Sequence, residues 1–348
     1  MYTTLPVPID SYPTAFDRIE ATPVDIEALL NILQLRRDAN SDAEQMLIDT
    51  YIKPLDPVED LYGNLFVTVG DLPAAAFTAH TDTVHSNRKG DKRERQALRF
   101  NTARTLVMTE PEEDCLGADD GTGIWVLLNM IEAGVPGLYC FFRDEESGRG
   151  GSDWSAKKEP DRYAGITMML SFDRKGITDV ITHQMGSRCC SEVFAEHISK
   201  AINDQCAPDD TGSFTDSYSF THLIPECTNI CVGYYAQHTG MERQDLTWAA
   251  YLVNQLIAIN WSIVPVERDP LKSKYAGDYT MLEIVELFPE EVAGMLEDYM
   301  GLTTNDMVEA IADINNLTPQ TVTDELDHAY ELSVDYLDSW DWDKDFRL

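Results

Sequence analysis

Two histidines and one aspartate lie close together in the stretch TAHTDTVH, at residues 78–85. This stretch overlaps the end of an apolar run, residues 74–79, that predicts a buried β-strand. Residues two apart in a strand point to the same face, so His80 and Asp82 can lie side by side. Asp82 could then hold one ring nitrogen of His80 while the other nitrogen binds a metal. The same cluster is also typical of an ordinary turn, so the rest of the chain must distinguish the two.

More carboxylates follow at the ends of other apolar segments. Asp119 lies in CLGADDGTG, where it could equally cap a helix. Glu145 and Glu146 follow the strand-like GLYCFFR, and adjacent residues of an extended chain project to opposite sides. One of these glutamates can therefore bind a metal while the other faces the substrate. Metal-assisted hydrolysis needs this division, because a Lewis acid must act beside a carboxylate that takes the proton.

Two later segments complete the series, with Asp173 in LSFDRKG and His238 in VGYYAQHTGME. Both follow apolar, strand-like runs. Open α/β sheets bind their ligands at the carboxyl ends of the strands. The joint order of these groups therefore indicates one shared site at that edge of a sheet.

Strand-like and helical segments alternate along the chain, which predicts a three-layer α/β/α sandwich with a mixed, mostly parallel sheet. We expect two helices within residues 23–53, with a break near Asn40 and Ser41, and a hairpin around residues 102–104. Further helices are expected at 119–134, 191–203 and 245–263, and strands at 61–70, 74–79, 137–143, 165–173, 177–184 and 229–235.

The polar stretch VERDPLKSKYAGD predicts a domain boundary. We expect a catalytic domain at residues 1–268 and an acidic, helical C-terminal extension at residues 269–348. The basic run at residues 86–97 predicts a solvated loop. The extension contains no metal or nucleophile motif.

Composition excludes several classes of protein. The chain has 26 Lys and Arg against 61 Asp and Glu, a net charge of −35 that opposes binding to nucleic acid or to anionic membranes. We expect no secretion signal, because the first 20 residues have neither a basic nor an apolar segment, and no apolar run reaches membrane-spanning length. The seven cysteines lack a disulfide-framework or zinc-finger spacing, which favours reduced thiols and a cytoplasmic location.

The ordered series AHTDTV, LGADDGTG, RDEESGRGGS, SFDRKG and YYAQHTGME resembles the five metal-site motifs of the co-catalytic zinc exopeptidases. That superfamily includes peptidase T, carboxypeptidase G, secreted bacterial leucine aminopeptidases and acylamino-acid deacylases. The resemblance extends from about Tyr62 to Trp261 and implies an α/β/α sandwich with two Zn²⁺ ions, which Co²⁺ or Mn²⁺ could replace.

The resemblance also implies a role for each matching residue. His80 and Asp173 would bind one zinc, Glu146 and His238 would bind the other, and Asp119 would bridge the two. Asp82 would orient His80, and Glu145 would be the general base that activates water for attack on an amide. The Asp119–Asp120 peptide would be cis. Several other residues could contact substrate, with Arg174 the best candidate: Arg174, His183, Gln184, Arg188, Asp216, His222 and Glu242.

The subfamily stays open at this stage. Only 64 residues separate Asp173 from His238, too few for the inserted dimerisation domain of the peptidase T and carboxypeptidase G types. The motif wording is nevertheless nearer to peptidase T. Oligomeric state cannot be read from the sequence.

We expect an aminopeptidase that releases N-terminal residues from peptides. One alternative is a deacylase or carboxypeptidase acting on acylated amino acids or peptides, which would need a positively charged residue such as Arg174 or Arg188 to bind the substrate carboxylate. The others are a non-catalytic binding relative and a single-zinc acyltransferase that resembles glutaminyl cyclase. A non-catalytic relative is disfavoured because all five ligands, Glu145 and Asp82 are present.

Overall fold

The computed structural model describes residues 25–71, 73–85, 93–111 and 113–270, together with residues 308–309, 312 and 318–322. The chain divides into two compact units, Met1–Arg268 and Asp269–Leu348. All predicted site residues belong to the first unit. Much of the basic run at 86–97 and most of the predicted helical extension lie outside the described residues, so both stay predictions.

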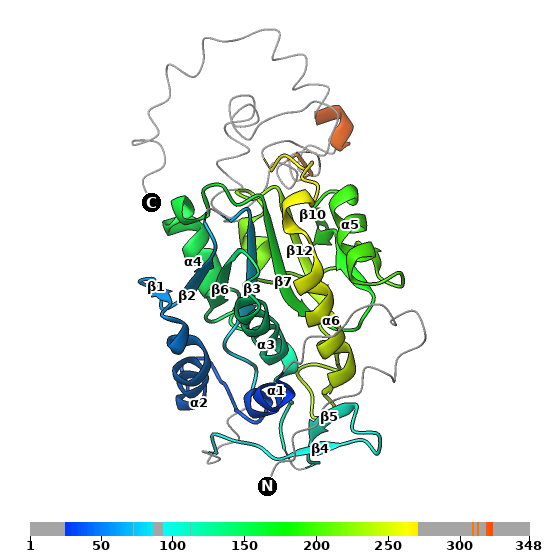
Figure 1. The fold of residues 1–348 in the computed structure, drawn as a ribbon. Coiled ribbons are helices and arrows are strands. Elements are labelled where there is room, and N and C mark those ends of the chain that lie inside the picture. Colours follow the sequence, from blue (N-terminus) through cyan, green and yellow to red (C-terminus); the bar gives the residue numbers. More distant parts are fainter. Residues whose placement is uncertain are drawn as a thin grey trace. The chain divides into compact units, whose positions relative to one another are not determined.

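A mixed sheet of eight strands forms the centre of the first unit (Figure 1), in the order β1-β2-β6-β3-β7-β12-β8-β11. The pairs β6–β3, β3–β7, β7–β12 and β8–β11 are parallel, and the other three pairs are antiparallel. The strands are β1 Val58–Glu59, β2 Leu65–Val69, β3 Ala75–His80, β6 Gly137–Phe142, β7 Met168–Arg174, β8 Asp179–Ile181, β11 Ala207–Asp209 and β12 Glu226–Cys231.

Helices cover both faces of this sheet. One core lies between the sheet and α1, α3, α5 and α6, and contains Trp125 and Trp248. The other lies between the opposite face and α4 and η6, where the rings of Phe142 and Phe220 stack with centroids 5.6 Å apart. The helices are α1 Ile26–Leu33, α2 Asp42–Leu47, α3 Ala118–Glu132, α4 Gly150–Lys158, α5 Glu192–Ile202 and α6 Leu246–Ala258. The predicted three-layer sandwich is confirmed.

The central position of β3 follows from its sequence. All six of its residues are buried, and they alternate between the two cores, with Phe77 and Ala79 in the first and Ala76 in the second. A strand that is apolar on both faces must be covered on both faces, so β3 lies between two parallel neighbours, β6 and β7. His80 ends this strand.

Shorter elements border the sheet. The predicted hairpin is β4 Leu98–Phe100 with β5 Leu106–Thr109, which extends through β14 Arg243–Asp245 to β13 Tyr234–Tyr235. A second hairpin joins β9 His183–Gln184 to β10 Ser187–Arg188. The remaining turns of helix are η3 Ile48–Ile52, η4 Lys53–Leu55, η5 Pro160–Tyr163, η6 Asp216–Phe220 and η7 Trp261–Ile263.

The sequence analysis missed one helix. Helix α4 was not predicted, because its sequence GGSDWSAKK lacks an apolar stripe at helical spacing. Residues 174–237 add β8 to β13, α5 and η6 to the first unit, which agrees with the expectation that this segment is too short for an inserted domain. Among the described helices, none combines the length and the apolar character that crossing a membrane requires.

Candidate metal centre

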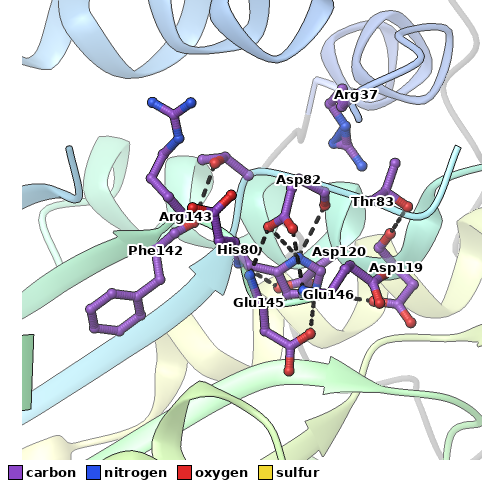
Figure 2. A network of polar contacts seen from close by, with 12 residues as sticks. Arg37, His80, Asp82, Thr83, Asp119, Asp120, Phe142, Arg143, Glu145 and Glu146 are labelled. Carbon is purple, nitrogen blue, oxygen red and sulfur yellow. Dashed lines mark hydrogen bonds and ion pairs between the residues drawn. The ribbon is translucent and has the colours of Figure 1, made fainter. Parts of the chain in front are cut away.

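The predicted site residues meet at the carboxyl edge of the parallel strands. Figure 2 shows five of them close together: His80, Asp82, Asp119, Glu145 and Glu146. His80 is the last residue of β3 and pairs in register with Phe142, the last residue of β6. Glu145 and Glu146 lie just beyond β6, and Asp173 lies near the end of β7. Parallel pairing therefore brings residues that are far apart in sequence to one edge, as the motif order predicted.

Asp119 lies between the two histidines. Its Oδ1 is 3.2 Å from His80 Nε2, and its Oδ2 is 3.1 Å from His238 Nε2. One carboxylate thus presents one oxygen to each imidazole. This geometry matches the bridging role that the resemblance implied for Asp119.

The ligating atoms form two clusters that share Asp119. In each cluster the atoms lie within 4.8 Å of one another: His80, Asp119 and Asp173 in the first, and Asp119, Glu146 and His238 in the second. Two imidazoles and three carboxylates suit a divalent cation such as zinc. The structure thus brings together all five predicted ligands, in the predicted grouping.

The carboxylates of the second cluster favour a cation there. The Oε1 atom of Glu146 is buried and lies 3.0 Å from His238 Nε2. Hydrogen bonds to Asp119 and Glu146 raise the pKa of His238 to about 10. Carboxylates that stabilise a proton on this imidazole so strongly would also stabilise a metal ion bound to the same nitrogen.

Glu145 lies beside these ligands without belonging to either cluster. Its Oε2 is 4.0 Å from His80 Nε2, and its side chain is buried. Burial raises the pKa of Glu145 to about 10, and the charge of His80 opposes this while those of Asp173 and Asp216 add to it. Its place beside the predicted ligands, outside both clusters, leaves this carboxyl group able to exchange a proton with a molecule bound there.

Asp82 supports the site through the backbone. Its carboxylate accepts hydrogen bonds from the N–H groups of Glu145 and Glu146, at 3.1 and 3.2 Å. Its carbonyl oxygen lies 3.0 Å from His80 Nδ1, closer than its carboxylate at 3.5 Å. Asp82 therefore connects the end of β3 to the turn after β6, in addition to contacting His80 as predicted.

The backbone at Asp119 has an unusual conformation. The Asp119–Asp120 peptide is cis, as the resemblance implied. Asp120 turns away from the ligands and accepts the N–H groups of His80 and Gly123, each at 3.1 Å. A Cβ on Gly123 would lie only 2.2 Å from Asp120 Oδ1 and 2.6 Å from the carbonyl oxygen of Phe172. Gly123, the second glycine of DDGTG, is therefore required by close packing.

Glu242 holds the segment that carries Asp119. Its buried carboxylate accepts three backbone N–H groups, from Gly117 at 3.0 Å, Ala118 at 2.9 Å and Asp119 at 3.1 Å. Burial and the charge of Asp119 raise the pKa of Glu242 to about 7, against the effect of these bonds. Glu242 follows His238 by four residues, so it links the segments of two ligands.

Arg37 contacts the same segment. Its guanidinium is fully buried and donates a hydrogen bond to the carbonyl of Gly117 at 2.7 Å. The backbone N–H of Arg37 donates to His85 Nδ1 at 3.1 Å, and its carbonyl accepts the Thr83 N–H at 2.8 Å. The loop between α1 and α2 is thereby joined to the residues that follow β3. His85 is a buried partner of the loop and lies in neither ligand cluster.

A second buried carboxylate ties the N-terminal helices to the sheet. Glu44 on α2 accepts the Thr81 hydroxyl at 2.5 Å and forms an ion pair with Arg143 at 2.8 Å. Thr81 follows β3, and Arg143 follows β6. The ends of both strands are therefore braced by the same helix.

Hydroxyl groups orient Asp173. Tyr234 donates to its Oδ1 at 3.0 Å, and Thr215 donates to its Oδ2 at 2.8 Å. Asn229 accepts the Asp173 N–H and donates to its carbonyl, both at 2.9 Å. Arg37, Thr215 and Tyr234 were not predicted, since nothing in their local sequence marks contacts with residues more than 40 positions away.

A cavity of about 250 Å³ opens over the ligands. Of the predicted substrate contacts, only Arg174 borders it. The guanidinium of Arg174 is occupied, with Asp179 at 3.1 Å and Asp209 at 3.6 Å. Its role in substrate binding remains a prediction. The cavity is lined by Asp119, Glu145, Glu146, Asp173, Arg174, Lys175, Ser213, Phe214, Tyr234, Gln237 and His238.

Solved structures share this fold, although no known family profile and no curated protein matches the sequence. The aminopeptidase PepT from Bacillus cereus matches with a TM-score of 0.53 and 12% identity, over 69% of this chain and 98% of that one. A tripeptidase from Staphylococcus aureus gives 0.53 and 13%, over 67% and 95%. A TET aminopeptidase from a marine-sediment Thaumarchaeota archaeon gives 0.53 and 11%, over 70% and 97%. This chain has the fold of these peptidases.

The resemblance drawn from the motifs is thus confirmed at the level of the fold. At such low identity, the likeness does not establish a substrate. The chemistry of this chain has to be argued from its own site residues.

Proposed function

We propose that this protein is a metal-dependent exopeptidase, most simply a two-zinc aminopeptidase that releases N-terminal residues from peptides. The observation that carries the proposal is the pair of ligand clusters sharing Asp119, with the buried carboxylate of Glu145 beside them. A structural metal site would not need a protonatable group at that position. The aminopeptidase structures with the same fold support this substrate class.

The proposed mechanism divides the work among the site residues. Two divalent cations, when bound, would acidify a water molecule and polarise an amide carbonyl. Glu145 takes the proton from the water and then passes it to the departing amine. Asp82 holds Glu145 in place through its backbone N–H, and Tyr234 and Thr215 fix the carboxylate of Asp173.

Metal content and turnover of matched variants test this proposal. We expect about two zinc ions per chain by elemental analysis, and cleavage of free-amine peptides but not of their N-acetylated forms. Glu145→Gln should keep both metals and lose most of its turnover, by a factor of about 10² or more. Asp119→Ala should lose metal.

Three results would overturn it. Near wild-type turnover in Glu145→Gln would refute the assignment of the base. Activity on acylated substrates only would favour a deacylase or carboxypeptidase, and no activity in fully metal-loaded protein would favour a binding protein.

The wider setting is also a proposal. We infer a peptide substrate from the site residues and a cytoplasmic location from the seven cysteines, which lack a disulfide-framework spacing. We infer no nucleic-acid or membrane partner because the chain is strongly acidic. A structure of the TET1 peptidase from Pyrococcus horikoshii, with a TM-score of 0.51 and 15% identity over 67% of this chain and 98% of that one, is described as assembling into a tetrahedron or an octahedral shell. The oligomeric state of this chain should therefore be measured beside its activity.

A further inference from the structure

Two consecutive basic residues, Arg174 and Lys175, border the cavity, and their surroundings differ. Arg174 is largely buried and is neutralised by Asp179 and Asp209. Its guanidinium also donates to the Thr211 hydroxyl at 3.0 Å. Arg174 therefore has little charge left to offer a ligand in the cavity.

Lys175 is exposed at the cavity edge, and its ammonium has no ion pair with any described residue. It is the first residue after β7, two residues beyond Asp173. It lines the same cavity as Asp119, Asp173 and His238. Arg174, between Asp173 and Lys175, turns towards Asp179 instead. Lys175 thus adds a positive charge to the edge of the cavity that the predicted metal ligands line.

The rest of the lining favours a small substrate with a polar end. Ser213 offers a hydroxyl and Gln237 an amide beside the exposed ring of Phe214. The guanidinium carbon of Arg149 lies 4.9 Å from the centre of that ring and 4.8 Å from the ring of Tyr218. These contacts hold Phe214 in place as an apolar wall.

We infer that Lys175 binds a substrate carboxylate, so that the enzyme prefers peptides carrying a negative charge about one residue from the cleaved bond. This inference rests on the proposed function. The carboxylate has two sources in a peptide: the side chain of an N-terminal Glu or Asp, or the free C-terminus of a di- or tripeptide. The positive charge of Lys175 matters because the protein carries a net charge of −35, which repels anionic substrates elsewhere on its surface.

Paired substrates distinguish the two sources. The zinc-loaded protein is assayed with Glu-Ala-amide against Gln-Ala-amide, and with Ala-Ala-Ala against its C-terminal amide. The ratio of kcat/KM within the first pair reports the side chain, and the ratio within the second pair reports the C-terminus. We expect the charged member to be favoured by about fivefold in at least one pair, as for one partly exposed charge contact.

Variants assign this preference to Lys175. Lys175→Gln should remove most of the preference, Lys175→Glu should reverse it, and Lys175→Arg should keep it. In the wild type, the preference should weaken as salt screens the contact. The matched control is Lys200→Gln on α5, an exposed lysine paired with Glu196 and absent from the cavity lining. Metal content and melting temperature are measured for every variant.

The outcomes separate this inference from the proposed function. If free-amine peptides are cleaved but Lys175→Gln leaves both ratios unchanged, the Lys175 inference is wrong and the peptidase proposal stands. If no peptide is cleaved, the proposed function fails, and calorimetric binding of Ala-Ala-Ala and its amide to wild type and Lys175→Gln still tests Lys175. Equal affinity for both peptides in the wild type would then refute the inference as well.

Discussion

Removing the carboxylate of Glu242 should loosen the segment that carries Asp119, the proposed bridging ligand. In Glu242→Ala, three backbone N–H groups lose their acceptor at once. A hydrogen bond to a charged acceptor contributes about 1.5–3 kcal/mol, and an unpaired buried donor adds a penalty. The raised pKa of Glu242 shows that its burial offsets part of this gain. We therefore expect a loss of about 3–5 kcal/mol in the free energy of unfolding.

Glu242→Gln separates the hydrogen bonds from the charge. Its amide oxygen can still accept the N–H groups of Ala118 and Asp119, whereas its NH₂ group would face the N–H of Gly117. One bond is lost, so we expect a smaller cost of about 1–2 kcal/mol. Zinc affinity should follow the same order, falling at least tenfold in the alanine variant, since tenfold corresponds to about 1.4 kcal/mol.

Urea unfolding of the metal-free protein and zinc titration against a competing chelator measure these two effects. Glu132→Ala is the matched control, because Glu132 is an exposed residue on the same helix as Asp119. If Glu242→Ala unfolds at the wild-type urea concentration and binds zinc with wild-type affinity, Glu242 does not hold the Asp119 segment and the reasoning is refuted.

Two further predictions concern residues around this segment. Burial and the charge of Arg37 lower the pKa of His85 to about 3, so the neutral ring is favoured in the folded state. The contribution of His85 to the free energy of unfolding should therefore be complete above about pH 6.5. It should fall by up to about 4 kcal/mol as the pH drops towards 3. His85→Asn should flatten this part of the pH profile of urea unfolding, and an unchanged profile would show that His85 is not its cause. Gly123→Ala should lower the unfolding free energy by about 1–3 kcal/mol, because the new methyl group would overlap Asp120 and the Phe172 carbonyl; an unaltered melting temperature would contradict the packing described for Gly123.

Local patterns were sufficient to predict most of the fold and the ligand set. The apolar runs that end at His80 and Asp173 predict both a strand and its polar end, and parallel pairing then brings those ends together. The bridging role of Asp119 came from the resemblance, since DDG alone is equally typical of a helix cap. The cap interpretation of Asp119 is wrong, because Gly117 is the N-cap residue of α3 and no side chain caps this helix. The bridging role of Asp119 stays a prediction.

The supporting residues could not be predicted in the same way. Glu242 contacts residues more than 120 positions earlier, and Arg37 contacts one 80 positions later, so neither leaves a periodic signal. Arg174 is different, because the sequence analysis took it as the best candidate for substrate contact. Alternation of side chains along β7 instead turns it away from Asp173. Its pairing with Asp179 and Asp209 depends on β8 and β11, and the position of these strands at the edge of the sheet is set by the order of all its strands.

The contacts of Arg37 and Glu44 also determine how short a working fragment of this chain can be. Every metal-site motif lies after residue 77, so a fragment beginning at Tyr62 would contain all of them. That fragment would lack the guanidinium against Gly117 and the carboxylate that braces Thr81 and Arg143. Shortening by sequence motif would therefore cut through the support of the site, and the α1 and α2 helices belong to its minimal functional core.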